Sequence, residues 1–135
     1  EDEGVVGRMI FGIGTDIVTV ARIEAAMLRH GDSFAQRILS PQEYAELAVN
    51  THPARFIAKR FAAKEAFAKA TGQGLRHPLS LRRIAVSHDE LGKPVFVFDA
   101  ELSAHLEQLG IGHHHLSISD ERDTALAFVI LERKV

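Results

Sequence analysis

The hydrophobic residues of this chain recur with two different periods, which predicts strands in some segments and helices in others. Short apolar runs bounded by glycine, proline or acidic residues indicate strands, and apolar residues that return every third or fourth position indicate helices. The predicted strands are 9–15, 82–88, 94–98, 113–119 and 124–131. The predicted helices are 19–30, 41–49, 53–71 and 99–109. This order predicts an α+β fold in a small single domain, with an antiparallel sheet packed with one long helix.

Capping and turn residues mark several of these boundaries. Residues 40–43 read Ser-Pro-Gln-Glu, which is the pattern of a capping box at a helix start. Gly31 and Gly72 follow two helical segments, where a residue without a Cβ accommodates a left-handed turn. Residues 89–93 contain a glycine and separate two strand-like runs, which predicts a β-hairpin.

The long predicted helix carries two charged side chains among apolar ones. Glu65 and Lys69 are four residues apart in the run RFAAKEAFAKATG, which is otherwise mostly alanine and phenylalanine. Phe61 shares the side of Glu65 and Phe67 lies opposite, so neither side is plainly a solvent face. A carboxylate among apolar residues is costly to bury unless a basic side chain or a metal ion meets it. Lys69 and Mg²⁺ are the candidates, and an exposed Glu65–Lys69 pair is the simpler alternative.

Length and composition predict one compact domain that forms an oligomer. The 135 residues, 46% of them apolar, can bury a sizeable core but are few for an enzyme that holds a cofactor-sized ligand alone, so oligomerisation is expected. The absence of cysteine excludes disulfides and thiolate zinc sites. No apolar stretch approaches the roughly 20 residues of a membrane span, and the start EDEGVVGR does not have the form of a signal peptide. We therefore expect no membrane contact and a cytoplasmic location. Residues 1–8 are expected to be a remnant of expression or an extended start, and residues 9–135 to form one domain.

Charge is segregated along the chain, although the net charge is only −2. Residues 55–83 carry eight basic side chains and one acid, whereas residues 84–132 carry nine acids and two basic side chains. Such segregation predicts an anionic partner near the basic segment, although charge runs also form ordinary solvated faces. Nucleic acid is the most general interpretation of such a partner.

Three motifs follow one another in a specific order. They are IFGIGTDIV with a following Arg-Ile pair (10–23), KRFAAKEAFAKATG (59–72), and LGKP (91–94) together with HLSISDE (115–121). In type, order and spacing they resemble the holo-acyl-carrier-protein synthases, the small bacterial 4′-phosphopantetheinyl transferases, over residues 9 to about 132. The resemblance implies the 4′-phosphopantetheinyl transferase fold and a homotrimer with coenzyme A bound between subunits. It also implies an enzyme of fatty acid biosynthesis that moves the phosphopantetheine arm of coenzyme A onto a serine of acyl carrier protein, releasing adenosine 3′,5′-bisphosphate.

The resemblance also implies roles for the residues at matching positions. In the family, the residues equivalent to Asp16 and Glu65 hold Mg²⁺, and the one equivalent to Lys69 faces the phosphates, which makes these three the expected catalytic residues. The expected coenzyme A contacts are Arg60, Lys64, Lys69, Gly72, Lys93, Pro94 and His115. The first helix receives the acidic carrier protein in the family, and the expected docking residues are Arg22, Arg29 and Arg37. Many relatives end the HxSxS segment with a second histidine, but this chain has Asp120, so no role of that histidine carries over.

Elementary chemistry gives an independent reason for these residue types. Mg²⁺ prefers octahedral oxygen ligands and keeps several waters, so one or two carboxylates plus phosphate oxygens make a normal site. Asp16 follows the first predicted strand, so its carboxylate is expected at a strand end. The attacking serine must lose its proton, either to a carboxylate or to a metal-bound water, and the sequence does not distinguish the two.

Other patterns support weaker alternatives. Gly12 and Gly14 resemble half of a dinucleotide-binding fingerprint, but the third glycine is missing, and close approach of the backbone to a neighbour is the better interpretation. Three consecutive histidines at 113–115 suggest a metal, yet side chains alternate along a strand, so His114 is expected to point away from its two neighbours.

Two functions of other classes remain as alternatives to the transferase. A small nucleic-acid-binding domain would use the basic segment 55–83, but the phenylalanines there are expected in the core rather than on a stacking surface. A noncatalytic module that binds carrier proteins would be favoured by loss of Asp16, Glu65 or Lys69, and all three are present.

Overall fold

The computed structural model describes residues 9–135. The strands are β1 (Ile10–Thr19), β2 (Ile84–His88), β3 (Pro94–Phe98), β4 (Ile111–Asp120) and β5 (Thr124–Arg133). The helices are α2 (Val20–His30), α3 (Asp32–Ile38), α4 (Pro41–Leu47), α5 (Pro53–Thr71) and α6 (Ala100–Gln108), with a short 3₁₀ turn, η1 (Leu81–Arg83), before β2. The predicted α+β class and the predicted order of strands and long helices are confirmed.

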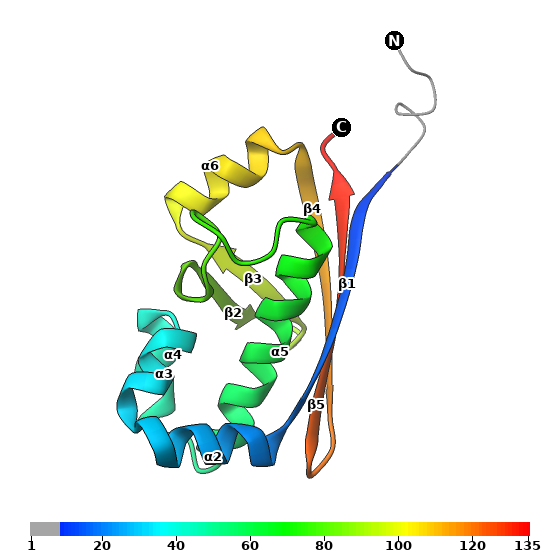
Figure 1. Ribbon diagram of the computed structural model, residues 1–135. Coiled ribbons are helices and arrows are strands. Elements are labelled where there is room, and N and C mark those ends of the chain that lie inside the picture. The colour runs from blue at the N-terminus through cyan, green and yellow to red at the C-terminus, as the bar shows by residue number, and fades with distance from the viewer. Residues whose placement is uncertain (1–8) are drawn as a thin grey trace.

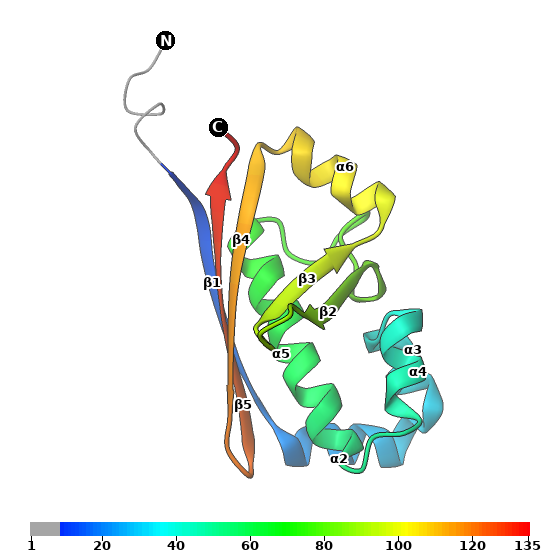
Figure 2. The ribbon, with the colours of Figure 1, turned by 180° about the vertical axis from the view of Figure 1, so that it is seen from behind.

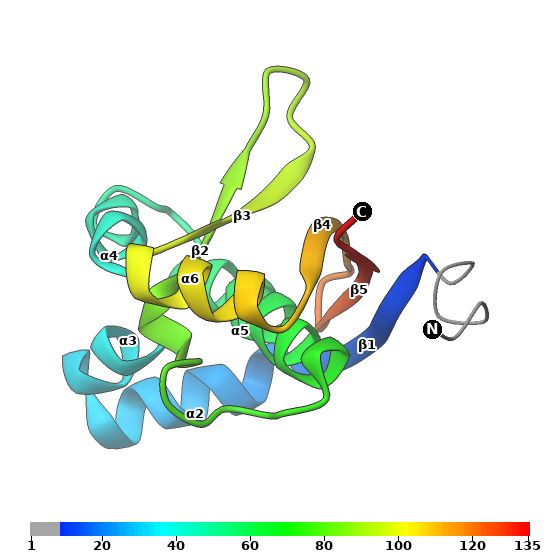
Figure 3. The same ribbon diagram turned by 90° about the horizontal axis from the view of Figure 1, so that it is seen from above.

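The molecule is built around a three-stranded antiparallel sheet and the long helix α5. The strand order is β1-β5-β4, and β2 pairs with β3 in a separate hairpin. Helix α5 lies along one face of the three-stranded sheet, with α2 at one end of the molecule and α6 at the other (Figure 1). Seen from behind, α3 and α4 lie on the side of α5 that faces away from the sheet (Figure 2). The connection between β2 and β3 projects from the body when the molecule is seen from above (Figure 3).

Strand β1 packs directly onto the backbone of α5 because two of its residues lack side chains. A Cβ on Gly14 would collide with the carbonyl oxygen of Ala66 and come within 2.7 Å of the backbone nitrogen of Ala70. A Cβ on Gly12 would likewise collide with the carbonyl oxygen of Ala70. The close-approach interpretation of these glycines is therefore confirmed, and this contact fixes β1 relative to α5.

The helix ends follow the predicted signals, with one element that the sequence analysis missed. Ser40 and Glu43 form the expected capping box, and Gly72 ends α5 in the left-handed conformation at φ 79°. Gly31 ends α2, but the chain then turns at once into α3, which was not predicted. The segment 32–38 is too short to show a clear apolar period, and its helical state depends on packing against its neighbours.

The second face of the three-stranded sheet carries apolar side chains that no described element covers. Ile13 is 59% exposed, Ile17 63%, Phe128 50% and Ile130 37%. The register pairs Ile13 with Ile130, so these side chains lie side by side across β1 and β5. Helices lie on the opposite side of this sheet (Figure 3). An apolar area of this kind is typical of a surface that binds another protein.

Candidate active site

Asp16 and Lys69 meet where β1 crosses the C-terminal half of α5. The Lys69 ammonium donates to Asp16 Oδ1 at 3.0 Å and to the carbonyl oxygen of Thr15 at 3.0 Å. Asp16 shares the inner face of β1 with Gly14 and Val18, so its side chain points toward α5. It lies within the strand rather than at its end, because β1 continues to Thr19, so the predicted strand end at Asp16 was wrong.

Glu65 lies beside this pair, partly buried on α5. Burial raises the pKa of Glu65 above its usual value, the charge of Asp16 raises it further, and Lys69 and Arg22 lower it. The two carboxylates therefore act on each other as neighbouring like charges. Lys69 forms its ion pair with Asp16, and the ion pairs of residues 9–135 do not include one between Glu65 and Lys69. The simple pairing within the helix is thus not the explanation for Glu65.

These two carboxylates fit a Mg²⁺ ion. Asp16 and Glu65 supply hard oxygen atoms, and their mutual repulsion is relieved by a cation placed between them. Two carboxylates are also the usual protein contribution to a magnesium site that phosphates and waters complete. Residues 9–135 contain no cluster of three or more histidine, cysteine, aspartate or glutamate side chains suited to a metal, so a site formed by protein side chains alone is not present there.

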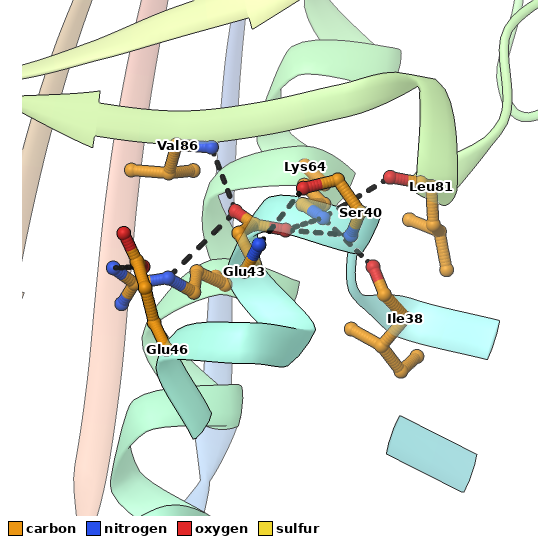
Figure 4. Close-up of polar contacts among 8 residues, drawn as sticks. Ile38, Ser40, Glu43, Glu46, Lys64, Leu81 and Val86 are labelled. Atoms are coloured by element: carbon orange, nitrogen blue, oxygen red, sulfur yellow. Dashed lines mark hydrogen bonds and ion pairs between the residues drawn. The ribbon is translucent and has the colours of Figure 1, made fainter. Parts of the chain in front are cut away.

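Lys64 does not face this site, and its predicted contact with coenzyme A is corrected. Its side chain is 0% exposed, and its ammonium donates to Glu43 Oε1 at 2.5 Å, to the Ile38 carbonyl at 2.7 Å and to the Leu81 carbonyl at 3.1 Å. Figure 4 shows these three acceptors around the lysine. Burial lowers the pKa of Lys64 to about 8, while Glu43 raises it. With all three donors used inside the protein, Lys64 has none left for a phosphate.

The predicted contact of Arg60 with coenzyme A is corrected for the same reason. Its guanidinium lies 3.8 Å from the centre of the Phe56 ring, and its nitrogens lie 3.7 Å from Glu43 and 3.6 Å from Glu46. The residue is 8% exposed, so these internal partners account for its charge. The basic segment 55–83 is therefore not one continuous anion-binding surface, because its central charges are neutralised inside the molecule.

The three predicted docking arginines do come together. Arg22, Arg29 and Arg37 line one groove of about 280 Å³, together with Phe34 of α3 and Phe61 of α5. Arg22 lies over the Phe61 ring at 5.4 Å and also acts electrostatically on Glu65. The groove that would receive a carrier protein thus adjoins the carboxylate site.

Of the remaining predicted coenzyme A contacts, His115 lies on the other face of the three-stranded sheet. His115 is on the exposed face of β4, where its Nε2 lies 2.8 Å from Glu132. Lys93 and Pro94 stand at the start of β3, and Lys93 is close enough to the histidines of β4 to contribute to lowering the pKa of His114, whose main cause is burial. The Nε2 of His114 accepts a bond from the Phe96 backbone at 3.0 Å, so His114 points away from its neighbours as predicted.

The sequence analysis missed the roles of two residues near this site. Glu43 was assigned only to the capping box, yet it is 1% exposed and also accepts from the Val86 backbone at 2.7 Å and from Lys64. Phe61 was assigned to the core, but it forms part of the groove wall. A buried acid paired with a distant lysine leaves no local sequence signal, because the two are 21 residues apart.

The sequence and the fold match one class of protein. The chain belongs to the 4′-phosphopantetheinyl transferase superfamily, whose family model matches residues 12–129. It is 55% identical over 125 residues to the holo-[acyl-carrier-protein] synthase of Nitrosospira multiformis, covering 93% of this chain and 100% of that protein. The resemblance that the three motifs indicated is confirmed.

Solved structures agree with this family membership. The holo-[acyl-carrier-protein] synthase of Neisseria meningitidis superposes with a TM-score of 0.91 at 52% identity, covering 93% of this chain and 100% of that one. A holo-(acyl-carrier-protein) synthase of Bacillus anthracis in complex with CoA (3′,5′-ADP) superposes with a TM-score of 0.77 at 36% identity, covering 93% and 99%.

Proposed function

We propose that this protein transfers the 4′-phosphopantetheine arm of coenzyme A to a serine of apo acyl carrier protein, with release of adenosine 3′,5′-bisphosphate. The proposal is carried by one observation: Asp16, Glu65 and Lys69 converge next to a groove with three arginines. Relatives that align over 93% of the chain are holo-acyl-carrier-protein synthases, which supports the same activity here. The reaction would supply holo carrier protein for fatty acid biosynthesis.

In the proposed reaction the serine oxygen forms a bond to the phosphorus that carries the pantetheine arm. The bond from this phosphorus to the bridging oxygen breaks, adenosine 3′,5′-bisphosphate leaves, and the serine proton is released. Mg²⁺ held by Asp16 and Glu65 would neutralise charge on the pyrophosphate. The Lys69 side chain is 54% exposed, so its ammonium is free to meet phosphate oxygens. Replacing Lys69 by alanine is expected to slow chemistry more than binding, because the charge it meets grows in the transition state.

We also propose that a second copy of the chain completes the coenzyme A site, as in a homotrimer. His115 lies on the uncovered face of the sheet, whereas Asp16 points to the face that packs on α5. The two residues therefore open on opposite faces of the sheet, which supports a site that two chains complete. The apolar residues of the uncovered face supply a surface on which copies could associate. Gly72, Lys93 and Pro94 remain predicted contacts at the edges of this shared site.

The decisive test is transfer itself. The protein is incubated with apo acyl carrier protein, coenzyme A and Mg²⁺, and the carrier is weighed by mass spectrometry. The expected result is a gain of the mass of one phosphopantetheine group, abolished by chelation of Mg²⁺. A carrier of unchanged mass at any Mg²⁺ concentration would contradict the proposal and favour a noncatalytic carrier-binding module.

Two further expectations from the sequence bear on this function. A nucleic-acid-binding role has less support than the sequence suggested, because Arg60 and Lys64 at the centre of the basic segment are neutralised internally. None of the helices within residues 9–135 has the length and apolar character that crossing a membrane would need. A cytoplasmic location stays a prediction.

A further inference from the structure

A second groove lies on the other side of α3 from the groove of the three docking arginines. It has a volume of about 990 Å³ and runs between α3 and the segment that leads into η1. Phe34 and Arg37 line both grooves, so the two form one continuous surface across α3. Apolar side chains from the facing segment also line it, among them Leu75, which is 41% exposed.

Two of the three arginines that line this second groove have no acidic partner within residues 9–135. Arg37 and Arg82 are both exposed, and the ion pairs within residues 9–135 include neither of them. Arg83, the next residue, differs in that its Nη1 lies 3.3 Å from Asp99 and 2.7 Å from Glu101. A groove with apolar walls and two unneutralised arginines fits a partner segment that presents apolar side chains flanked by carboxylates.

The two walls of this groove are joined from beneath by Lys64. Its ammonium donates to the carbonyl of Ile38, at the end of α3, and to the carbonyl of Leu81, at the start of η1. Both acceptor residues line the groove. Figure 4 shows Lys64 between these two carbonyls, with Glu43 as the third partner. Because Lys64 is fully buried and extended from the rigid helix α5, it sets the distance between the walls.

We propose that the docking surface for the acyl carrier protein continues across α3 into this second groove, where Arg82 meets a second acidic segment of the carrier and Lys64 positions the two walls. The inference rests on the proposed transferase function. The carrier is the preferred occupant because the groove is continuous with the surface that adjoins Glu65, and because its free charges are positive. Coenzyme A is the competing occupant, and the experiment separates the two.

The test measures transfer kinetics with apo acyl carrier protein varied at saturating coenzyme A, and then the reverse. Arg82→Glu is expected to lower kcat/KM for the carrier by about fivefold to tenfold, with a weaker dependence on salt, as charge reversal at a docking surface does. The KM for coenzyme A and kcat at saturating carrier stay at the wild-type values. Arg29→Glu, in the first groove, serves as the reference for the size of the effect.

Lys134→Glu is the control, since it makes the same charge reversal at the far end of the chain, where Lys134 pairs with Glu107. It should leave the carrier kinetics unchanged.

Lys64→Met should raise the KM for the carrier and not that for coenzyme A, and Arg82→Glu carries the test alone if this variant does not fold. A wild-type value of kcat/KM for the carrier in Arg82→Glu, or a raised KM for coenzyme A, would overturn the inference. Failure of the proposed function would instead appear as absence of transfer by the wild-type protein.

Discussion

The surroundings of Glu65 disfavour the ionised form of its carboxyl group. Burial and the neighbouring Asp16 raise its pKa, while Lys69 and Arg22 compensate only in part. A carboxyl with a raised pKa holds its proton more tightly in the folded state than in the unfolded chain, so its ionisation at neutral pH opposes folding. A carboxylate that served only the fold would lower the stability of the protein at this position. A carboxylate that binds a cation does not have this disadvantage once the cation is bound, because the cation removes the repulsion.

This reasoning predicts opposite effects of Glu65→Gln on stability and on activity. The variant should unfold at the same temperature as the wild type or higher, because the repulsion with Asp16 is gone. Transfer should fall by about a hundredfold or more, since a bound metal contributes several kcal/mol to lowering the barrier. Thermal unfolding with and without Mg²⁺ provides a separate measurement: the ion should stabilise the wild type and not the variant. Near-normal turnover in Glu65→Gln would rule out the metal role.

At the scale of elements, the pair Lys64 and Glu43 fastens α3, α4 and η1 to the helix that carries the active site. Glu43 is 1% exposed and Lys64 0%, so neither charge has access to water. Removing one partner of such a pair leaves an uncompensated buried charge, which costs about 3–5 kcal/mol. Removing both costs less than the sum of the single changes, because the lost attraction is counted twice in that sum.

A double-mutant cycle tests this description of the element contacts. Lys64→Met and Glu43→Gln should each lower the free energy of unfolding by several kcal/mol, and the double variant should be less destabilised than the two single effects together. Denaturant unfolding measures all four proteins. Glu46→Gln is the matched control, because Glu46 is on the same helix but exposed, and its change should have little effect. Strict additivity of Lys64→Met and Glu43→Gln would show that the pair is not coupled.

At the scale of the whole molecule, the uncovered sheet face and the proposed sharing of the coenzyme A site predict that copies of the chain associate through this face. Phe128→Asp should convert an oligomer into a monomer and abolish transfer, as light scattering and the mass assay would report. Val49→Asp is the control, since Val49 is 85% exposed outside the sheet. A Phe128→Asp protein that stays oligomeric and active would exclude this face as the interface.

Mixing two inactive variants tests the shared site more directly. Glu65→Gln removes one half of the proposed site, and the double variant Lys93→Glu/His115→Ala removes the other. If each site combines residues of two chains, exchange of subunits should restore part of the activity in the mixture. Mixtures that remain inactive although the subunits exchange would contradict a shared site.

The sequence by itself determined the features that depend on neighbours along the chain. The capping box at Ser40, the left-handed end at Gly72 and the β2–β3 hairpin each follow from local chemistry, and each is present. The family, and with it the expectation of a carboxylate pair, followed from motifs whose order is a property of the sequence alone. The alternation of side chains along β4 was predictable for the same reason.

Only the tertiary structure decided which of the charged residues are free to act. Arg60, Lys64 and Lys69 look alike on one helix, yet Lys64 is enclosed by Glu43 and two carbonyls, whereas Lys69 remains half exposed beside Asp16. The difference arises because α5 is packed against other elements along most of its circumference, so the burial of each position depends on segments far away in the sequence. Hydrophobic periodicity cannot report this, because a helix buried on most sides has no single apolar face.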